Sequence, residues 1–303
     1  MELAGIVFKQ TVTMFILMAI GYFLYKGKII TNHCSKELSK MLVSVVIPAV
    51  IIKSYAVEFS WEKLRLLGMA GGMALIALVL AMIVCHFLYG GKKKVDNFGI
   101  SFSNAGFVGI PLVSAVLGQE AVFYVSIFVA LLNLLQQTYG VMVMTQNTSY
   151  IRLRKILTNP ILISLAVGLL LFVLPVEFPG IATECIAYIA GLNTPVAMLI
   201  LGVYLAQSDL KDILTNGKLY ASSAVRLLVL PVLTVIIFKI LPVPADIKMI
   251  ELIAAATPVG SNVAVFAQLH DLDYGYAAKM VCNSTILSIF TLPVVVFLAS
   301  SIF

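Results

Sequence analysis

Apolar residues run along this chain in long blocks that are separated by short polar segments. An α-helix needs roughly 20 apolar residues to cross the ~30 Å hydrocarbon core of a bilayer. By that measure the pattern predicts ten membrane spans, at 7–25, 38–56, 66–89, 98–118, 121–144, 159–174, 184–206, 219–241, 249–269 and 277–299. The first block resembles the later ones and lacks a small-residue cleavage site, so we expect a membrane helix there rather than a signal peptide.

The amino-acid composition agrees with this pattern. Hydrophobic residues make up 61% of the 303 residues and charged residues only 11%, whereas soluble domains average about 45–50% and about 25%. A single soluble core cannot bury so much apolar surface at this length. We therefore expect an all-α integral membrane protein, which excludes a soluble enzyme, a disordered regulator and a disulfide scaffold.

The net charge of +6 does not indicate a nucleic-acid partner, because the basic residues lie in short clusters between the apolar blocks. Lys and Arg are concentrated after odd-numbered blocks, as at 26–40, 92–94 and 152–155. Basic loops of membrane proteins stay on the cytoplasmic side. The pattern thus predicts a multi-pass protein of the cell membrane with both termini outside.

The spacing of prolines indicates an internal repeat. Pro48 and Pro195 are 147 residues apart, and the same distance separates Pro111 from Pro258. Proline-interrupted segments at matching places in two inverted halves point to the binding site of a transporter. The alternative is that the prolines match by chance, because prolines punctuate many membrane helices.

The predicted halves, 1–150 and 151–303, hold five spans each, so the second half would enter the membrane in the opposite direction. In the fourth span Pro111 removes a backbone donor, and we expect a second half-helix to begin near Ile110. In the ninth span we expect Thr257 to cap a half-helix whose first turn holds Pro258. The N–H groups at such helix starts carry partial positive charge and suit a carboxylate or another anion. The alternative is that the prolines only kink two structural helices.

Polar side chains near the two interruptions are the candidate substrate-binding groups, because each would be costly in lipid without a partner. They are Ser103, Asn104, Ser261 and Asn262, beside Pro111 and Pro258. Other polar residues of neighbouring spans either line the same cavity or hold helices together, and these are Asn133, Gln136 and Asn283. Arg226 either attracts an anion or hydrogen-bonds helix-end carbonyl groups as a brace.

Acidic residues are expected only in loops or near helix ends, and Glu251, near the start of the ninth span, is among those closest to the membrane core. A buried carboxyl group is the usual proton carrier of a proton antiporter. This distribution therefore favours an anion site built from amides, hydroxyls and helix ends. It leaves the coupling ion, Na⁺ or H⁺, open.

Cysteines and histidines are scattered without the spacing of metal ligands, so we expect no metal site, no cofactor and no disulfide framework. An intramembrane enzyme would need a nucleophile with a base, a pair of mid-membrane aspartates or an H-E-x-x-H helix. The sequence contains none of these patterns. We therefore expect that the protein is not an enzyme.

Four stretches together resemble the auxin efflux carriers and their bacterial relatives. They are N-A-G-F-V-G-I-P-L (104–112), A-M-L-I-L-G-V-Y-L-A (197–206), A-V-R-L-L-V-L-P (224–231) and A-A-A-T-P-V-G…V-F-A (254–267), in matching order over essentially the whole chain. The resemblance implies two inverted five-helix repeats with crossed, broken helices 4 and 9, as in sodium/proton antiporters and bile acid transporters. It also implies a scaffold of helices 1, 2, 6 and 7, a transport domain of helices 3–5 and 8–10, a homodimer formed through the scaffold, and an elevator-like movement.

In plant members of that family the residue that matches Asn104 binds the substrate carboxylate. Asn159-Pro160 resembles the start of the plant N-P-N-T-Y motif, but Ile161 replaces its second asparagine, and the long cytoplasmic loop of many plant members is missing. These departures point away from auxin and toward small carboxylates such as malate and malonate, which are associated with the bacterial relatives. We expect a secondary transporter of a mono- or dicarboxylate. The alternatives are a sodium- or proton-coupled exchanger of related fold and a membrane sensor that binds without transport.

Overall fold

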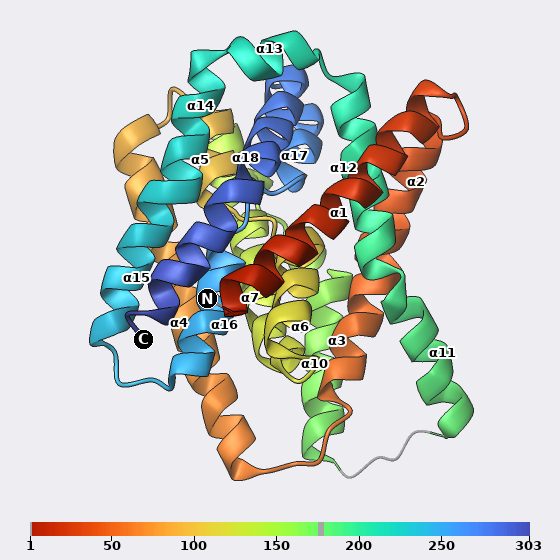
Figure 1. The fold of residues 1–303 in the computed structure, drawn as a ribbon, viewed down its shortest axis with the longest axis vertical. Coiled ribbons are helices and arrows are strands. Elements are labelled where there is room, and N and C mark those ends of the chain that lie inside the picture. Colours follow the sequence, from red (N-terminus) through yellow and green to blue (C-terminus); the bar gives the residue numbers. More distant parts are fainter. Residues whose placement is uncertain (1, 175–178) are drawn as a thin grey trace.

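The computed structural model describes residues 2–174 and 179–303, which form a bundle of helices (Figure 1). The α-helices are α1 (Glu2–Lys26), α2 (Asn32–Met41), α3 (Ile47–Tyr55), α4 (Trp61–Tyr89), α5 (Lys94–Ser101), α6 (Ile110–Leu117), α7 (Ala121–Leu135), α8 (Val141–Thr145), α9 (Leu153–Leu157), α10 (Pro160–Val173), α11 (Gly180–Gly191), α12 (Asn193–Gln207), α13 (Leu210–Thr215), α14 (Gly217–Ala224), α15 (Leu230–Ile240), α16 (Ala245–Ala256), α17 (Asn262–Leu269) and α18 (Tyr274–Ser300). Wider π-type turns occur at η1 (Leu42–Val46), η2 (Ala105–Gly109), η3 (Gln136–Gly140) and η5 (Val225–Val229), and η4 (Thr148–Tyr150) is a 3₁₀ turn.

Among the described residues, seven helical stretches are apolar and long enough to cross a membrane, so the chain is a multi-pass membrane protein. They are Gly5–Lys26, Asn32–Tyr55, Trp61–Tyr89, Ala121–Thr145, Gly180–Gln207, Gly217–Ile240 and Tyr274–Ser300. Each coincides with a predicted span. The sixth predicted span is the shorter helix α10, and the fourth and ninth are interrupted. The count of ten spans and the inverted repeat stay predictions.

Pro48, Pro111 and Pro231 lie inside continuous helical stretches, and a wide turn precedes each one. Pro48, Pro111 and Pro231 are each the second residue after η1, η2 and η5, respectively. The residue before each proline donates its N–H to the carbonyl group five residues back instead of four. In a regular helix the proline ring clashes with the carbonyl four residues back, and the wider turn gives it room.

Helix α1 crosses α12 at very close range. A Cβ atom added to Gly21 would lie 2.3 Å from the carbonyl oxygen of Leu199, and one added to Gly202 would lie 2.0 Å from that of Met18. Small residues let membrane helices approach closely in this way. Helices α10 and α11 pack against α3, so elements of the predicted scaffold contact one another.

Helices α4, α5, α7 and α14 to α18 form the other side of the bundle, to the left in Figure 1. Helix α4 packs against α5, α7 and α16, while α18 packs against α14 and α17. These are elements of the predicted transport domain. Helix α1 contacts α6 and α18 as well. The division into a fixed scaffold and a moving domain stays a prediction.

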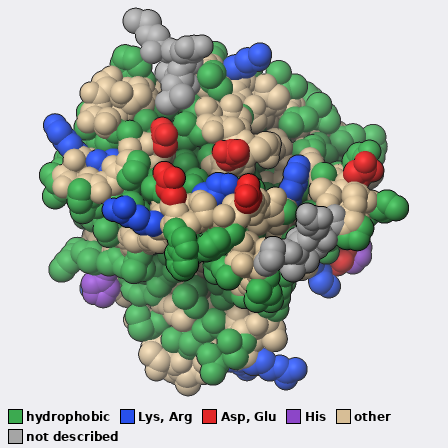
Figure 2. Space-filling view, turned by 90° about the horizontal axis from the view of Figure 1, so that it is seen from below, with side chains coloured by type: hydrophobic (Ala, Val, Ile, Leu, Met, Phe, Trp, Pro, Cys, Tyr) green, Lys and Arg blue, Asp and Glu red, His purple; other side chains and the backbone are tan. Residues whose placement is uncertain are grey.

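The two ends of the bundle differ in the loops that they carry. The loop between α1 and α2 and the segment around α13, both predicted to be cytoplasmic, lie at the top of Figure 1, whereas both chain ends are marked in its lower half. Figure 2 views the lower end, where acidic and basic side chains gather across one half of the face and hydrophobic side chains surround them. The orientation in the membrane stays a prediction.

Candidate functional site

The interruptions of the fourth and ninth predicted spans meet inside the bundle. The main-chain N–H of Asn104 donates to the carbonyl of Pro258 over 2.9 Å, and the N–H of Gly260 donates to the carbonyl of Phe102 over 3.0 Å. The two segments therefore pair in antiparallel fashion, and we call this pairing of 102–104 with 258–260 the crossover. A Cβ atom at Gly260 would lie 2.9 Å from the main-chain oxygen of Ser103, so glycine is needed for this approach.

In the fourth span the helix is interrupted earlier in the sequence than the predicted position near Ile110. Helix α5 ends at Ser101, and the next half-helix begins at Ala105 rather than near Ile110. The prediction assumed that Pro111 must start a new helix. The wide turn η2 instead accommodates Pro111, so the helix extends one and a half turns further toward the crossover.

In the ninth span the predicted helix start is also wrong. The Thr257 hydroxyl donates to the carbonyl of Ala254 over 2.9 Å, so it stabilises the end of α16 rather than the start of the next helix. Pro258 lies in the extended segment, and α17 begins at Asn262. The physical reason is that a residue before proline is disfavoured in the helical conformation, which ends α16 before Pro258.

Arg226 holds both ends of the crossover from η5. Its Nε donates to the carbonyl of Thr257 over 2.9 Å, its Nη1 donates to that of Ile100 over 3.0 Å, and its Nη2 donates to that of Ala255. These carbonyls belong to the C-terminal ends of α16 and α5, which carry partial negative charge. The sequence allowed two roles for Arg226, attraction of an anion or a structural brace between helix ends. Its three hydrogen bonds to main-chain carbonyls are those of a structural brace.

A small cavity of about 30 Å³ adjoins the crossover. It is lined by Val43, Ile47, Ser103, Asn104, Gly106, Phe107, Val129, Leu132, Asn133, Gln136, Ile161, Gly260, Ser261 and Asn262. The structure thus brings together six of the predicted residues, which come from both interrupted spans, from α7 and from η3. Such a volume holds no more than a water molecule or two, so in this conformation the cavity is closed to a carboxylate substrate.

Two hydrogen-bond donors at this cavity have no partner among the described residues. They are Nδ2 of Asn104 and Oγ of Ser103, and both side chains are buried. Leaving a buried polar group unpaired costs about 1–3 kcal/mol. Both groups can donate to an anionic oxygen, and they stand at the start of a half-helix, where the N–H groups of the first turn lack intrahelical partners.

Asn262 and Gln136 close the opposite side of the cavity. The Nδ2 group of Asn262 donates to Oε1 of Gln136 over 2.8 Å, which joins α17 to η3. Asn133, one turn before Gln136, donates its amide to the carbonyl of Val129 over 2.8 Å. The cavity therefore has amides on two sides.

The remaining predicted residues do not line this cavity. Asn283 accepts a hydrogen bond from Ser223 over 2.7 Å and donates to the carbonyl of Ile213 over 3.0 Å, so it holds helices together. The Asn159 side chain accepts from the N–H of Ile161 over 2.9 Å and caps α10. Pro111 lies instead on the wall of a second, larger cavity.

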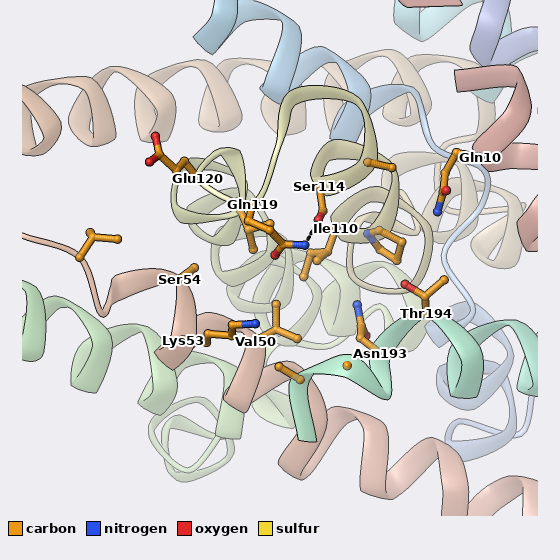
Figure 3. Close-up of a pocket in the computed structure, with 16 residues that line it drawn as sticks. Gln10, Val50, Lys53, Ser54, Ile110, Ser114, Gln119, Glu120, Asn193 and Thr194 are labelled. Carbon is orange, nitrogen blue, oxygen red and sulfur yellow. Dashed lines mark hydrogen bonds between the residues drawn. The ribbon is translucent and has the colours of Figure 1, made fainter. Parts of the chain in front are cut away.

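This larger cavity, which we call the vestibule, has a volume of about 480 Å³ and is open. It lies between α3, α6, α11 and α12, near the loop that joins α6 to α7. Figure 3 shows the side chains of Lys53 and Asn193 at this cavity, while the carboxylate of Glu120 points away. The amide nitrogen of Gln119 points to Ser114, to whose hydroxyl it donates over 2.6 Å. The sequence analysis missed these residues. One of them could have been found from the sequence. Asn193 stands two residues before Pro195, the proline that matches Pro48 in the other half of the predicted repeat.

Glu251 lies where the sequence analysis expected no carboxylate. Its side chain is 0% exposed, and neither carboxylate oxygen has a hydrogen-bond partner in the described chain. The prediction that acidic residues occupy only loops and helix ends is therefore wrong for Glu251. Helix α16 begins at Ala245, earlier than the predicted start at 249, because Asp246 and Lys248 are part of the helix and place Glu251 nearly two turns inside it.

A bundle of apolar helices that encloses a polar crossover defines a multi-pass membrane protein. Residues 6–296 match the family described as membrane transport protein, so this chain belongs to that family and is a membrane transporter. This match confirms the resemblance to the auxin efflux carriers and their relatives. The chain is also 25% identical over 312 residues to an uncharacterized transporter of Methanothermobacter thermautotrophicus, and the aligned region covers 94% of this chain and 96% of the relative.

Proposed function

We propose that this transporter carries a small organic anion, a mono- or dicarboxylate, and that the substrate carboxylate binds at the crossover. The observation that supports this most is the pair of unpartnered donors, Asn104 Nδ2 and Ser103 Oγ, beside a half-helix start. A carboxylate accepts hydrogen bonds through two oxygens and so matches two adjacent donors. Ser261 and Asn262 at the start of α17 complete the site from the other side.

The positive potential of the site comes from helix ends rather than from a charged side chain. Arg226 donates to main-chain carbonyls at the C-terminal ends of α5 and α16 and so offsets their negative charge. The half-helix starts at Ala105 and Asn262, whose N–H groups favour an anion, then dominate the field at the cavity. A site of this kind binds an anion without trapping it in a fixed ion pair, which suits repeated loading and release.

Transport requires the closed cavity to open alternately to each side of the membrane. In the proposed mechanism helices 3–5 and 8–10 move as an elevator against a scaffold of helices 1, 2, 6 and 7, through which two copies form a homodimer in the cell membrane. With both termini outside, the vestibule faces outward, and Pro111 on its wall belongs to the half-helix that leads to the crossover. The vestibule then gathers the anion before the cavity opens.

Thermal denaturation of the purified protein tests this proposal. Malonate at 100 times its dissociation constant should add about 2.7 kcal/mol of stability, which appears as a raised melting temperature. Malonamide, which has a similar shape and no charge, is the matched control and should add nothing. Equal stabilisation by both compounds would contradict an anion site. Binding of malonate without flux in proteoliposomes would favour the alternative of a membrane sensor.

The variant Lys53→Gln should raise several-fold the malonate concentration that gives half-maximal uptake, while the maximal rate stays unchanged. Lys53 is exposed and lines the vestibule, so it attracts anions without belonging to the crossover. The effect should fade at high salt, because salt screens exposed charges. Lys63→Gln, which removes a charge outside the vestibule, is the control. Equal uptake curves for both variants would exclude this role.

A further inference from the structure

Glu251 stands on the half-helix that leads into the crossover. It lies six residues before Thr257, about 9 Å at 1.5 Å per residue, and one turn before Ala255, whose carbonyl accepts from Arg226. The side chain is 0% exposed. A buried carboxyl group in this place has no part in the anion site described above, so its presence calls for another role.

The surroundings of Glu251 supply no compensating charge within the described chain. Helix α16 packs against α4, α6, α7, α15 and α18, and the buried residues of these helices include no charged side chain. Arg226 donates to three carbonyl groups, and Lys248 at the start of α16 stands over the ring of Phe303.

An ionised carboxylate is not stable in such a place. Removing an unpaired charge from water costs several kcal/mol even after the protein relaxes, and a neutral carboxyl group costs far less. The closed conformation therefore accommodates Glu251 with a proton on one of its oxygens. Release of that proton requires water to reach the carboxyl group. The helices that pack on α16 belong to the proposed moving domain, so water reaches it when that domain separates from the scaffold.

The contact between Tyr55 and Ser126 shows where such a separation would occur. Their hydroxyl groups form a hydrogen bond of 3.0 Å between α3, in the proposed scaffold, and α7, in the proposed moving domain. Helix α16, which carries Glu251, packs against the same helix α7. A shift of the moving domain along α3 would break the hydrogen bond and expose this region of α16.

We propose that Glu251 is a proton-binding residue that couples anion transport to proton movement. This proposal rests on the proposed function, because it assigns the coupling ion of that transport. Glu251 binds one proton when the loaded crossover closes and releases it on the other side when the helices separate. Moving a monoanion together with one proton transfers no net charge, which removes a contribution of about 2.3 kcal/mol per elementary charge at 100 mV.

Uptake of malonate into proteoliposomes tests the coupling with the Glu251→Gln variant, in which an amide of similar size replaces the neutral carboxyl. Malonate is mainly a dianion at neutral pH, so with one proton it still carries one negative charge. With the membrane potential held at zero, a pH difference of about one unit should drive about tenfold accumulation by the wild type at a ratio of one proton per malonate. Glu251→Gln should keep exchange of internal for external malonate and lose this accumulation. Glu184→Gln, which alters an exposed carboxylate on α11, should behave as wild type. A pH-driven accumulation that persists in Glu251→Gln would overturn the proposal.

Infrared difference spectroscopy of the purified protein provides a readout that needs no substrate. The wild type at neutral pH should show the carbonyl band of a protonated carboxylic acid, which Glu251→Gln removes and Glu251→Asp shifts. Absence of that band from the wild type would overturn the assignment of Glu251 whatever the substrate is. If the band is present but the protein does not transport malonate, the proposed substrate is wrong. The assignment of Glu251 as a protonated residue is then still supported.

Discussion

Replacing Asn104 with alanine should leave the empty protein at least as stable as the wild type and remove its stabilisation by malonate. The Asn104 amide nitrogen has no partner in the described structure, so its removal breaks no hydrogen bond. With a carboxylate bound, the same group supplies a bond worth about 1.5–3 kcal/mol, or about ten- to 150-fold in the dissociation constant. Thermal denaturation with and without malonate measures both effects.

Asn283→Ala is the matched control for this experiment. Asn283 is an equally buried asparagine, but its amide bonds with Ser223 and with the carbonyl of Ile213. Its removal should therefore lower the free energy of unfolding by about 1–3 kcal/mol and leave the malonate effect intact. The crossover site would be disproved if Asn104→Ala kept the malonate effect.

Replacing Arg226 with leucine should produce the largest loss of stability in the chain, about 3–5 kcal/mol, the range measured when one partner of a buried charged interaction is removed. Three main-chain carbonyls at the ends of α5 and α16 would lose their donors. Without them the crossover loses the side chain that joins its two halves. The free energy of unfolding in detergent, measured by thermal or chemical denaturation, tests this expectation.

Arg226→Lys distinguishes a brace from a simple positive charge. A lysine ammonium keeps the charge but lacks the planar fork that reaches several acceptors at once. It should therefore recover only part of the lost stability. A leucine variant that folds with wild-type stability but no longer binds malonate would show that Arg226 is an anion-binding residue and not a brace.

The prolines show which features of this fold can be predicted from the sequence and which cannot. Pro111 and Pro258 were both predicted to begin half-helices, since proline favours the first turn of a helix. The structure places Pro111 inside a helix behind a wide turn and Pro258 in the extended break. The sequence near each proline does not decide between these outcomes. The paired segments of the crossover decide it, because each supplies the other's main-chain hydrogen bonds.

Glu251 shows the same limit for charged residues. Hydropathy alone starts the ninth span near 249, which leaves Glu251 at its edge. The helix starts at Ala245, and α4, α7, α15 and α18 cover it on several sides, which converts an edge position into a buried one. Burial of this kind depends on the arrangement of helices that are distant in sequence. The local sequence pattern around Glu251 therefore does not predict it.

The sequence by itself determined that the chain crosses a membrane and that the fourth and ninth spans are interrupted, although it placed the first interruption at Pro111 rather than at 102–104. These properties follow from hydropathy and proline chemistry, which act within about 20 residues. Only the tertiary structure decided which polar groups have partners. Asn104 and Asn283 are the same residue type in similar apolar surroundings, but Ser223 and Ile213 reach Asn283, and no described side chain reaches the amide of Asn104. The physical reason is that hydrogen bonds between helices depend on which helices are neighbours, and that is settled when the whole bundle packs.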